Sequence, residues 1–302
     1  MQIRTVNPSL PFKQFQLGNL ELTIISDGYQ VMKPVHPIFA PLTESELVEQ
    51  LLKENFRSTD QVDLSLHILL IKKGDKLIMI DSGLGNEEPT AGYLQEALAA
   101  AGFKPTDITD IALTHGHLDH IGGLVTSNDA IAFPAANIHL PKTEYNFWTA
   151  DDPDFSQSPM KNNPGLLAGL ITRIKNILAV IKPKLQLIDQ SQVLFDCIRL
   201  VAAPGHTPGH TLINVFSGEE ELLHIADLIH SDVLLFPHPE WGFLFDTDLE
   251  QASATRRNIL EKLANHKMLA LAYHLPWPGL GYVRHKADAF EWVPKAYASP
   301  NH

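Results

Sequence analysis

Short apolar runs and longer amphipathic stretches alternate along the chain. The short runs are rich in leucine and β-branched residues and are bounded by Gly, Pro, Asp or Asn, a pattern that predicts strands. The predicted strands are Leu20–Ser26, Leu66–Lys72, Lys76–Asp81, Ile108–Thr114, Ile131–Leu140, Ile198–Ala203, Thr211–Phe216, Glu221–Ala226 and Met268–Tyr273. A turn containing Gly74 joins the second predicted strand to the third, and a turn containing Gly218 joins the seventh to the eighth, so we expect two β-hairpins. Strands alternating with helices indicate an α/β or α+β fold.

Helical spacing of apolar residues fills the gaps between these strands. The predicted helices are Thr43–Glu54, Tyr93–Ala101, Asn163–Lys182 and Leu249–Asn265. Thr43 and Glu46 have the spacing of a capping box at the start of the first helix. Gly102 is placed to end the second helix in the left-handed conformation. Asp246 or Asp248 is expected to cap the last helix.

The predicted helix over 163–182 interrupts the strand pattern after a polar, proline-containing stretch, Asp151–Asn163. Two interpretations stay open: a core helix, or an inserted lid or dimer-forming helix over a pocket. Gly165 and Gly169 would permit the close approach that the second interpretation needs. We expect one domain over residues 1–302 with an inserted helical segment at about 151–185, and a homodimer formed through the 163–182 helix if the second interpretation holds.

Composition and charge narrow the class of protein. Of the 302 residues, 44% are apolar and 19% are charged, which is an ordinary globular composition. The formal net charge of −12 repels a phosphate backbone, and no basic patch interrupts it. We therefore expect no nucleic-acid partner.

Signals of cellular location are few. Cys197 is the single cysteine, so no intramolecular disulfide is available and the fold fits a reducing compartment. The segment 1–11 lacks the apolar core of a secretory signal. No run of about 18 apolar residues is free of charge. We expect a cytoplasmic protein with no membrane partner.

Four candidate metal ligands, His115, His117, Asp119 and His120, lie within six positions directly after an apolar strand. Residues two apart on an extended chain point to the same side, so His115 and His117 can converge on one cation. The turn that follows would direct Asp119 and His120 towards a second cation. We expect residues 121–123, Ile-Gly-Gly, to open a helix beside this site.

Three further candidates follow predicted strands. His206 lies in the glycine-rich loop 204–210, Asp227 ends one strand, and His274 ends another. Sheets collect functional groups at strand ends, where the support is rigid. We expect His210 to support the loop that presents His206. The histidines without ligand spacing are His36, His67, His139, His224, His238, His266, His285 and His302.

In this order and at these separations, the seven candidates resemble the complete dinuclear ligand set of the metallo-β-lactamase-fold hydrolases. Asp81 resembles the acidic residue that braces the metal loop in this family. The resemblance covers nearly the whole chain. It implies a four-layer αββα sandwich, in which helices cover the outer faces of two packed sheets.

The resemblance also implies a role for each residue. The implied ligands are His115, His117 and His206 for one metal and Asp119, His120 and His274 for the other, with Asp227 bridging both. Two metals about 3.5–4 Å apart lower the pKa of a shared water, so a metal-bridged hydroxide would attack the substrate carbonyl. Asp119 would relay the proton. The catalytic candidates are therefore Asp119 and the bridging Asp227, together with His230, three residues beyond it. These ligands suit two divalent ions, Zn²⁺ first, with Fe²⁺, Co²⁺ or Mn²⁺ also compatible.

Particular residues separate the subgroups of the family. The β-lactamases carry Cys or Ser where Asp227 stands, and the di-iron reductases replace His117 by glutamate. Hydroxyacylglutathione hydrolases carry basic residues in a C-terminal region that is largely apolar and aromatic in this chain. The closest resemblance, carried by Ser26-Asp27-Gly28, 226–230 and 274–281, is to N-acyl-homoserine lactonases, aryl-ester hydrolases and methyl-parathion-hydrolase-like phosphotriesterases.

His230 departs from the lactonase pattern. Many lactonases have a tyrosine three residues beyond the bridging aspartate, whereas the phosphotriesterase-like branch resembles this chain in having histidine. His230 either lies behind the metals or at the surface, or it lines the pocket and hydrogen-bonds the substrate oxygen. Aromatic residues offer either apolar pocket walls or core packing: Phe147, Trp148, Phe236, Trp241, Phe243 and Trp277.

These features predict a dinuclear metal-dependent hydrolase for a small, neutral, partly hydrophobic substrate. A lactone of the N-acyl-homoserine type, which would make the protein quorum-quenching, or an aryl ester fits best. The alternatives are an organophosphate triester hydrolase and a hydroxyacylglutathione-type thioesterase. A metal-loaded protein whose enzymatic role is lost is the competing class.

Overall fold

The computed structural model of the chain describes residues 10–85 and 88–297. Most of the segment 1–11, for which we expected no secretory signal, lies outside the described residues. His302 lies outside them as well. The helices are α1 (Val35–Ile38), α2 (Ser45–Glu54), α3 (Leu94–Ala100), α4 (Leu118–Ile121), α5 (Lys142–Thr149), α6 (Pro164–Ile181) and α7 (Leu249–His266). The strands are β1 (Phe12–Leu17), β2 (Leu20–Met32), β3 (Val62–Lys73), β4 (Lys76–Ile80), β5 (Asp110–Ala112), β6 (Asn137–Pro141), β7 (Leu185–Ile188), β8 (Val193–Leu194), β9 (Ile198–Ala202), β10 (Thr211–Ser217), β11 (Glu220–His224), β12 (Leu269–Leu271), β13 (Leu280–Lys286) and β14 (Ala289–Pro294).

The strands form two mixed sheets of seven strands each. The first sheet follows chain order from β1 to β7, antiparallel up to β4 and parallel from β4 to β7. The second sheet has the order β14-β13-β12-β11-β10-β9-β8, and only β11 and β12 run parallel within it. The two predicted hairpins are confirmed, since β3 pairs with β4 and β10 pairs with β11.

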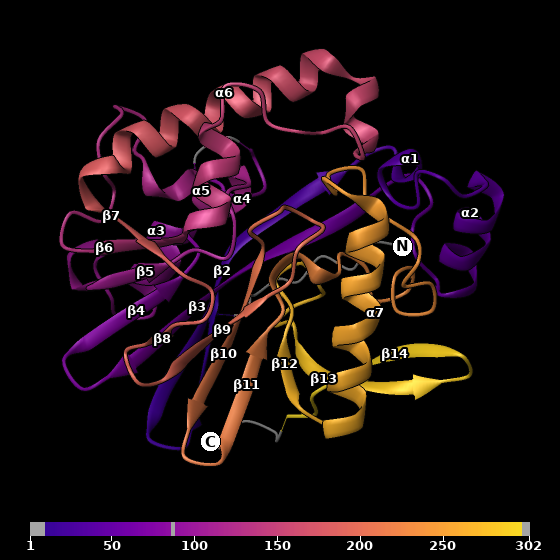
Figure 1. Cartoon of the computed structure of the whole chain (residues 1–302). Coiled ribbons are helices and arrows are strands. Elements are labelled where there is room, and N and C mark those ends of the chain that lie inside the picture. Colours follow the sequence, from indigo (N-terminus) through magenta and orange to yellow (C-terminus); the bar gives the residue numbers. More distant parts are fainter. Residues whose placement is uncertain (1–9, 86–87, 298–302) are drawn as a thin grey trace.

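Alternation along the strands explains why the molecule has four layers. On β3, Leu69 and Ile71 face the second sheet, whereas Leu70 faces the helices, because successive side chains point to opposite faces. One core lies between the sheets, and two others lie under the outer helices. Helices α3 to α6 cover the first sheet, and α7 covers the second (Figure 1). The predicted αββα sandwich is confirmed.

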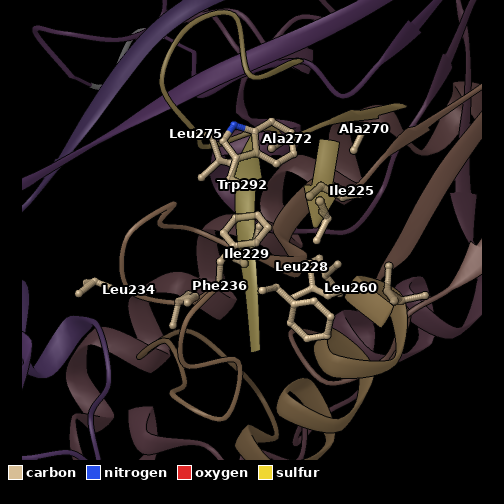
Figure 2. Close-up of a cluster of buried hydrophobic side chains, with 14 of the residues drawn as sticks. Ile225, Leu228, Ile229, Leu234, Phe236, Leu260, Ala270, Ala272, Leu275 and Trp292 are labelled. Carbon is tan, nitrogen blue, oxygen red and sulfur yellow. The ribbon is translucent and has the colours of Figure 1, made fainter. Parts of the chain in front are cut away.

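The core beneath α7 shows how a helix is fixed to the second sheet. Leu260 of α7 packs with Phe236, Ala270 and Trp292, all of them buried (Figure 2). Ala252, Ile259, Leu263 and Ala264 give α7 the rest of its buried face. This packing holds the strand ends that carry Asp227 and His274.

All nine predicted strands are present, although their ends differ. The strand predicted over 131–140 begins only at Asn137, and five more strands were not predicted: β1, β7, β8, β13 and β14. Strands β13 and β14 lie at a sheet edge, and Arg284 and Lys286 form ion pairs with Glu291 across them. Several of their buried apolar residues, Val283, Phe290 and Trp292, are interspersed with these charged side chains, which weakens the apolar pattern in the sequence.

The helix ends test the capping predictions. Asp248 accepts a hydrogen bond from Gln251 N at 2.9 Å, so the cap predicted for the last helix is confirmed at Asp248. Asn163, where a helix was predicted to start, caps α6 by accepting a hydrogen bond from Leu166 N at 3.2 Å. Gly102 has φ +87°, as a left-handed cap requires. The capping box at Thr43 is wrong, because α2 begins at Ser45 and no side chain caps it.

Helix α6 is mostly exposed along the top of the first half (Figure 1). Ile174, Leu178 and Ile181 are buried in the core beneath the helix, and further apolar side chains pack against it (Leu167, Leu170, Ile171 and Ile177), so one face is a core face, as the first interpretation predicted, while the opposite face is exposed. By length and composition alone, residues 164–184 could cross a membrane, with mean hydropathy 1.4. We did not predict this segment from the sequence, because charged residues interrupt its apolar run. The dimer role of this helix and the domain boundaries stay predictions.

Candidate metal centre

The loop after β5 carries the first four candidate ligands. The strand ends at Ala112, the chain stays extended through His117, and α4 begins at Leu118. The helix therefore opens earlier than predicted, and residues 122–124 form a 3-10 turn instead. Gly122 and Gly123 pack against the backbone of Leu84 and Ser82, where a Cβ would lie 2.1 and 1.9 Å from the two carbonyl oxygens. The glycines thus fix the loop to its neighbour.

The other three candidates reach the same place from the second sheet. His206 follows β9 after Gly205, whose φ is +130°. Asp227 lies in a 3-10 turn after β11, and His274 follows β12. His210 joins two of these loops as predicted, since its Nδ1 lies 2.9 Å from Ala203 O and its Nε2 accepts from Asp227 N at 3.2 Å.

Two clusters of ligand atoms result, and each draws residues from both sheets. The first cluster is His115, His117, His206 and Asp227, and the second cluster is Asp119, His120, Asp227 and His274. Within each cluster the ligand atoms all lie within 4.8 Å of one another. The predicted ligand set is therefore brought together, with Asp227 shared by both clusters.

Ring nitrogens face one another in the first cluster. His117 Nδ1 lies 3.1 Å from His115 Nε2 and 2.8 Å from His206 Nε2, and His206 Nε2 lies 3.2 Å from Asp227 Oδ2. Tetrahedral Zn–N bonds of about 2.0–2.1 Å place ligand atoms about 3.3 Å apart, so these separations fit one metal ion. Burial lowers the pKa of His115 and His117 well below its usual range, which keeps both rings neutral and able to bind a metal.

Carboxylates are more prominent in the second cluster. His120 Nε2 lies 2.9 Å from Asp227 Oδ1, and His274 Nε2 lies 3.2 Å from Asp227 Oδ2 and 3.4 Å from Asp119 Oδ2. Asp119 is 15% exposed, whereas both histidines are buried. Burial alone would raise the pKa of Asp227, but His120, His274 and His115 hold it well below its usual range. A buried carboxylate that stays ionised suits a cation.

The electrostatic environment of His206 also favours a bound cation. Burial acts to lower its pKa, yet Asp227 and Asp246 raise it to about 9. A cation is favoured at this position, and a metal ion would displace the proton from the ring. Nitrogen and carboxylate donors are also the set that Zn²⁺ and similar divalent ions prefer, so the residues present fit two metals.

The outward-facing ring nitrogens of His120 and His274 also have partners, whereas His117 Nε2 has no hydrogen-bond partner among the described residues. Asp81 Oδ2 lies 2.8 Å from His120 Nδ1, and Asp81 Oδ1 accepts from Thr114 N at 2.8 Å, which is the bracing contact predicted for it. His274 Nδ1 lies 3.0 Å from Ser65 O. Such partners orient the rings for metal binding.

Three supporting residues were not predicted in this role: Asp246, Arg256 and Glu144. Asp246, considered only as a helix cap, lies 2.8 Å from His206 Nδ1 and 3.4 Å from the guanidinium of Arg256. Arg256 is fully buried and also donates to the carbonyl oxygens of Leu228, Pro239 and Trp241. Glu144 connects two ligand loops. A polar residue on an amphipathic helix gives no sequence signal that distinguishes a buried partner from a solvated one.

His230 lies behind the shared carboxylate. Its Nε2 lies 3.1 Å from Asp227 Oδ2, and its ring stacks on Phe243 at 3.9 Å and on His274 at 5.1 Å. The ring is buried and is absent from the residues lining the cavity over the clusters. A contact with substrate stays a prediction, whereas the contact with Asp227 is present.

A cavity opens over both clusters. Polar residues in its lining are Gln30, Glu88, Arg173 and the ligands His117, Asp119, His206, Asp227 and His274, while the apolar lining is Met32, Leu64, Leu84, Leu118, Leu170, Phe243 and Phe245. Helix α6 contributes Leu170 and Arg173, so it forms part of the rim as the lid interpretation predicted. Such a mixture of apolar wall and convergent polar groups is typical of small-molecule sites.

Most of the aromatic residues proposed as cavity walls lie elsewhere. Phe243 lines the cavity, and Phe245 joins it without having been predicted. The remaining candidates pack in or against the hydrophobic cores: Phe147, Trp148, Phe236, Trp241 and Trp277. The core interpretation holds for these five.

Comparison with known proteins supports the geometry. The model of the metallo-beta-lactamase superfamily matches residues 64–274. A probable metallo-hydrolase of Mycobacterium bovis, Mb2322c, is 27% identical over 194 residues, which is 56% of this chain and 58% of that protein, so this chain matches little more than half of its length.

Two solved structures are similar over nearly the whole chain. AidC, a dizinc quorum-quenching lactonase in complex with the product N-hexanoyl-L-homoserine, is 44% identical, with TM-score 0.91 over 95% of this chain and 98% of that one. The hydrolase AbOPH is 26% identical, with TM-score 0.87 over 97% of this chain and 100% of that one. The fold, the two clusters and these matches together show that the chain is a metal-dependent hydrolase and belongs to the metallo-beta-lactamase superfamily.

Proposed function

We propose that this hydrolase opens the ring of N-acyl-homoserine lactones with two divalent metal ions, Zn²⁺ first among them. The observation that carries the proposal is the pair of clusters sharing Asp227 at the floor of a partly apolar cavity. Support comes from the 44% identity to AidC over 95% of the chain.

The bound metals would supply polarisation of the lactone carbonyl and a nucleophilic water at neutral pH. His115, His117 and His206 would hold one ion, Asp119, His120 and His274 the other, and Asp227 both. Asp119 is the more exposed of the two cluster carboxylates and lines the cavity. We assign it the transfer of a proton to the oxygen that leaves when the ring opens.

Contacts behind the ligands keep this arrangement fixed. His230 Nε2 lies against Asp227 Oδ2, which favours one orientation of the shared carboxylate. We therefore assign His230 a supporting role for Asp227, in place of direct contact with the substrate. The stacking of His230 on Phe243 connects this role to the cavity wall.

Cavity chemistry selects the substrate class. The wall formed by Met32, Leu64, Leu170 and Phe245 suits an acyl chain, while the polar floor suits a lactone ring. The net charge of −12 disfavours polyanionic substrates.

A hydrolysis panel on protein of measured metal content tests the proposal. We expect acyl-homoserine lactones of four- to ten-carbon chains to be opened faster than aryl esters, with activity lost on chelation and restored by about two equivalents of Zn²⁺. Preference for a phosphotriester or for an S-acylglutathione would contradict the lactone assignment. Two bound metals without any hydrolysis would contradict the enzymatic assignment itself.

A further inference from the structure

Glu144 is a fully buried carboxylate that belongs to neither ligand cluster. It lies on α5, the helix that packs beside the two loops carrying the first cluster. Its side chain reaches out of the helix between these loops, one of which follows the first sheet and the other the second. This placement separates it from an ordinary core residue.

Both oxygens of Glu144 are fully occupied. Oε1 accepts from Gly116 N at 2.9 Å and from Trp148 Nε1 at 2.6 Å. Oε2 accepts from Thr207 Oγ1 at 2.7 Å and from Gly209 N at 2.9 Å. An ionised carboxylate offers about four acceptor sites and no donor, so it matches these four donors.

The contacted residues stand next to metal ligands. Gly116 separates His115 from His117, and Thr207 follows His206. Trp148, held by the same carboxylate, packs edge-on against His117 with ring centroids 5.5 Å apart. Glu144 therefore acts on all three histidines of the first cluster, although it touches none of them.

Glycine at two positions allows this approach. A Cβ at Gly116 would lie 2.5 Å from Trp148 Nε1, and a Cβ at Gly209 would lie 2.3 Å from Glu144 N. The second of these contacts is with backbone, which cannot move aside without shifting α5. Both loops are therefore packed directly on this helix at the point where Glu144 enters.

We propose that Glu144 is a positioning residue for the first cluster, clamping the His115–His117 loop to the His206 loop and so setting the affinity of that metal site. The inference rests on the metal-dependent function proposed above. No contact with the second cluster is involved, since Asp81 and Ser65 O hold those histidines. One of two metal sites should depend on Glu144, and the other should not.

Glu144→Gln is the sharpest variant because it preserves volume. An amide keeps one acceptor oxygen, and its NH₂ group would face the backbone N–H of either Gly116 or Gly209, so one loop loses at least that hydrogen bond. We expect competition titration of the apoprotein with Zn²⁺ to show one site weakened about 10- to 100-fold and the other unchanged. Co²⁺ absorption and the indole N–H signal of Trp148 should change as well.

Single-site backgrounds assign the weakened site. In a His274→Ala background, where the three histidines of the first cluster are intact, Glu144→Gln should lower the remaining affinity. In a His206→Ala background it should have no effect. Asp110→Asn is the matched control, because Asp110 is a buried carboxylate whose partners are His139, Lys76 and Thr109, away from both clusters. Both metals should bind that control as they bind wild type.

Thr207→Val serves if Glu144→Gln does not fold. It removes one donor and should weaken the same site by about three- to tenfold.

Two results would overturn the inference. One is a folded Glu144→Gln variant that binds both metals with wild-type affinity, and the other is equal weakening by Asp110→Asn. Lactone turnover by Glu144→Gln should fall at limiting Zn²⁺ and recover with excess. Wild type that binds two metals but opens no lactone would overturn the proposed substrate and leave the role of Glu144 intact.

Discussion

The two clusters share Asp227 but are supported in different ways. In the first cluster, the ring of His206 contacts the charged side chain of Asp246, and the loops are joined through Glu144. In the second cluster, Asp81 supports His120, while the Nδ1 of His274 faces a backbone carbonyl and no charged group, and Asp119 is partly exposed to the cavity.

This difference separates two tasks within one centre. His117 and His206 line the cavity, but buried, hydrogen-bonded groups support the first cluster, so we expect its geometry to change little when substrate enters. The second cluster presents its most exposed ligand to the cavity, where the substrate must bind. A metal site that holds its ion tightly and a site that meets the substrate are thus built from the same residue types by different supports.

Asp227→Asn removes the feature that the clusters share, and we expect the largest effect from it. Loss of a charge between two cations should raise the barrier by about 4 kcal/mol, a fall in kcat/KM of about 10³-fold. Metal content and lactone hydrolysis measured on the same sample check this. Full turnover with two bound metals would show that the clusters work independently.

Buried histidines outside the clusters should contribute to the acid response of the metal-free protein. Burial between the sheets lowers the pKa of His67 and of His224 to about 4. The unfolded chain, with a histidine pKa near 6.5, then binds more protons, so stability is complete above about pH 6.5 and is lost as the pH falls towards 4. Each residue contributes about 3 kcal/mol to this loss.

His67→Leu tests this assignment. In denaturant unfolding with chelator present, the difference in unfolding free energy between pH 7 and pH 4 should shrink by about 3 kcal/mol relative to wild type. An unchanged pH dependence would place the acid sensitivity in the metal ligands instead.

Asp246→Asn sharpens the comparison of supports. We expect the first cluster to lose about 10- to 100-fold in metal affinity, because His206 loses its charged partner. The melting temperature should also fall, since Arg256 stays buried without its carboxylate. Asp81→Asn should weaken the second cluster instead. Equal loss at both clusters in either variant would refute the separation.

Leu170→Ala should give the smallest effect. Removing this partly buried side chain from the cavity rim costs about 1 kcal/mol of acyl-chain contact. The kcat/KM for a ten-carbon acyl lactone should then fall about fivefold, while that for a four-carbon chain should not change. Equal losses for both chain lengths would indicate that α6 affects the clusters and not the acyl chain.

Ligand identity could be predicted from the sequence because metal chemistry restricts it to a few residue types at strand ends. His115, His117 and His206 follow predicted strands, and the packing of the two sheets brings these strand ends together. The four-layer fold followed from the family resemblance, and the apolar faces of strands such as β3 agree with it.

Supporting residues could not be predicted in this way. Glu144 and Arg256 are buried, but each lies on a helix that also carries charged side chains at exposed positions. Only the packing of the helix decides which charged side chain is buried. Likewise β14 is short, so the alternation of its buried residues Phe290 and Trp292 gives only a weak strand signal. Phe245 lines the cavity from a loop, and a loop has no repeating pattern of apolar residues that could have predicted this position.

Each cluster takes two ligands from the first sheet and two from the second. Bound metals therefore act as non-covalent cross-links between the two halves of the sandwich. By mass action, an ion present at 100 times its dissociation constant stabilises the folded chain by about 2.7 kcal/mol per site. The cellular supply of metal would then govern how long the two halves stay docked, and hence how long the protein survives proteolysis, as well as whether it turns over substrate.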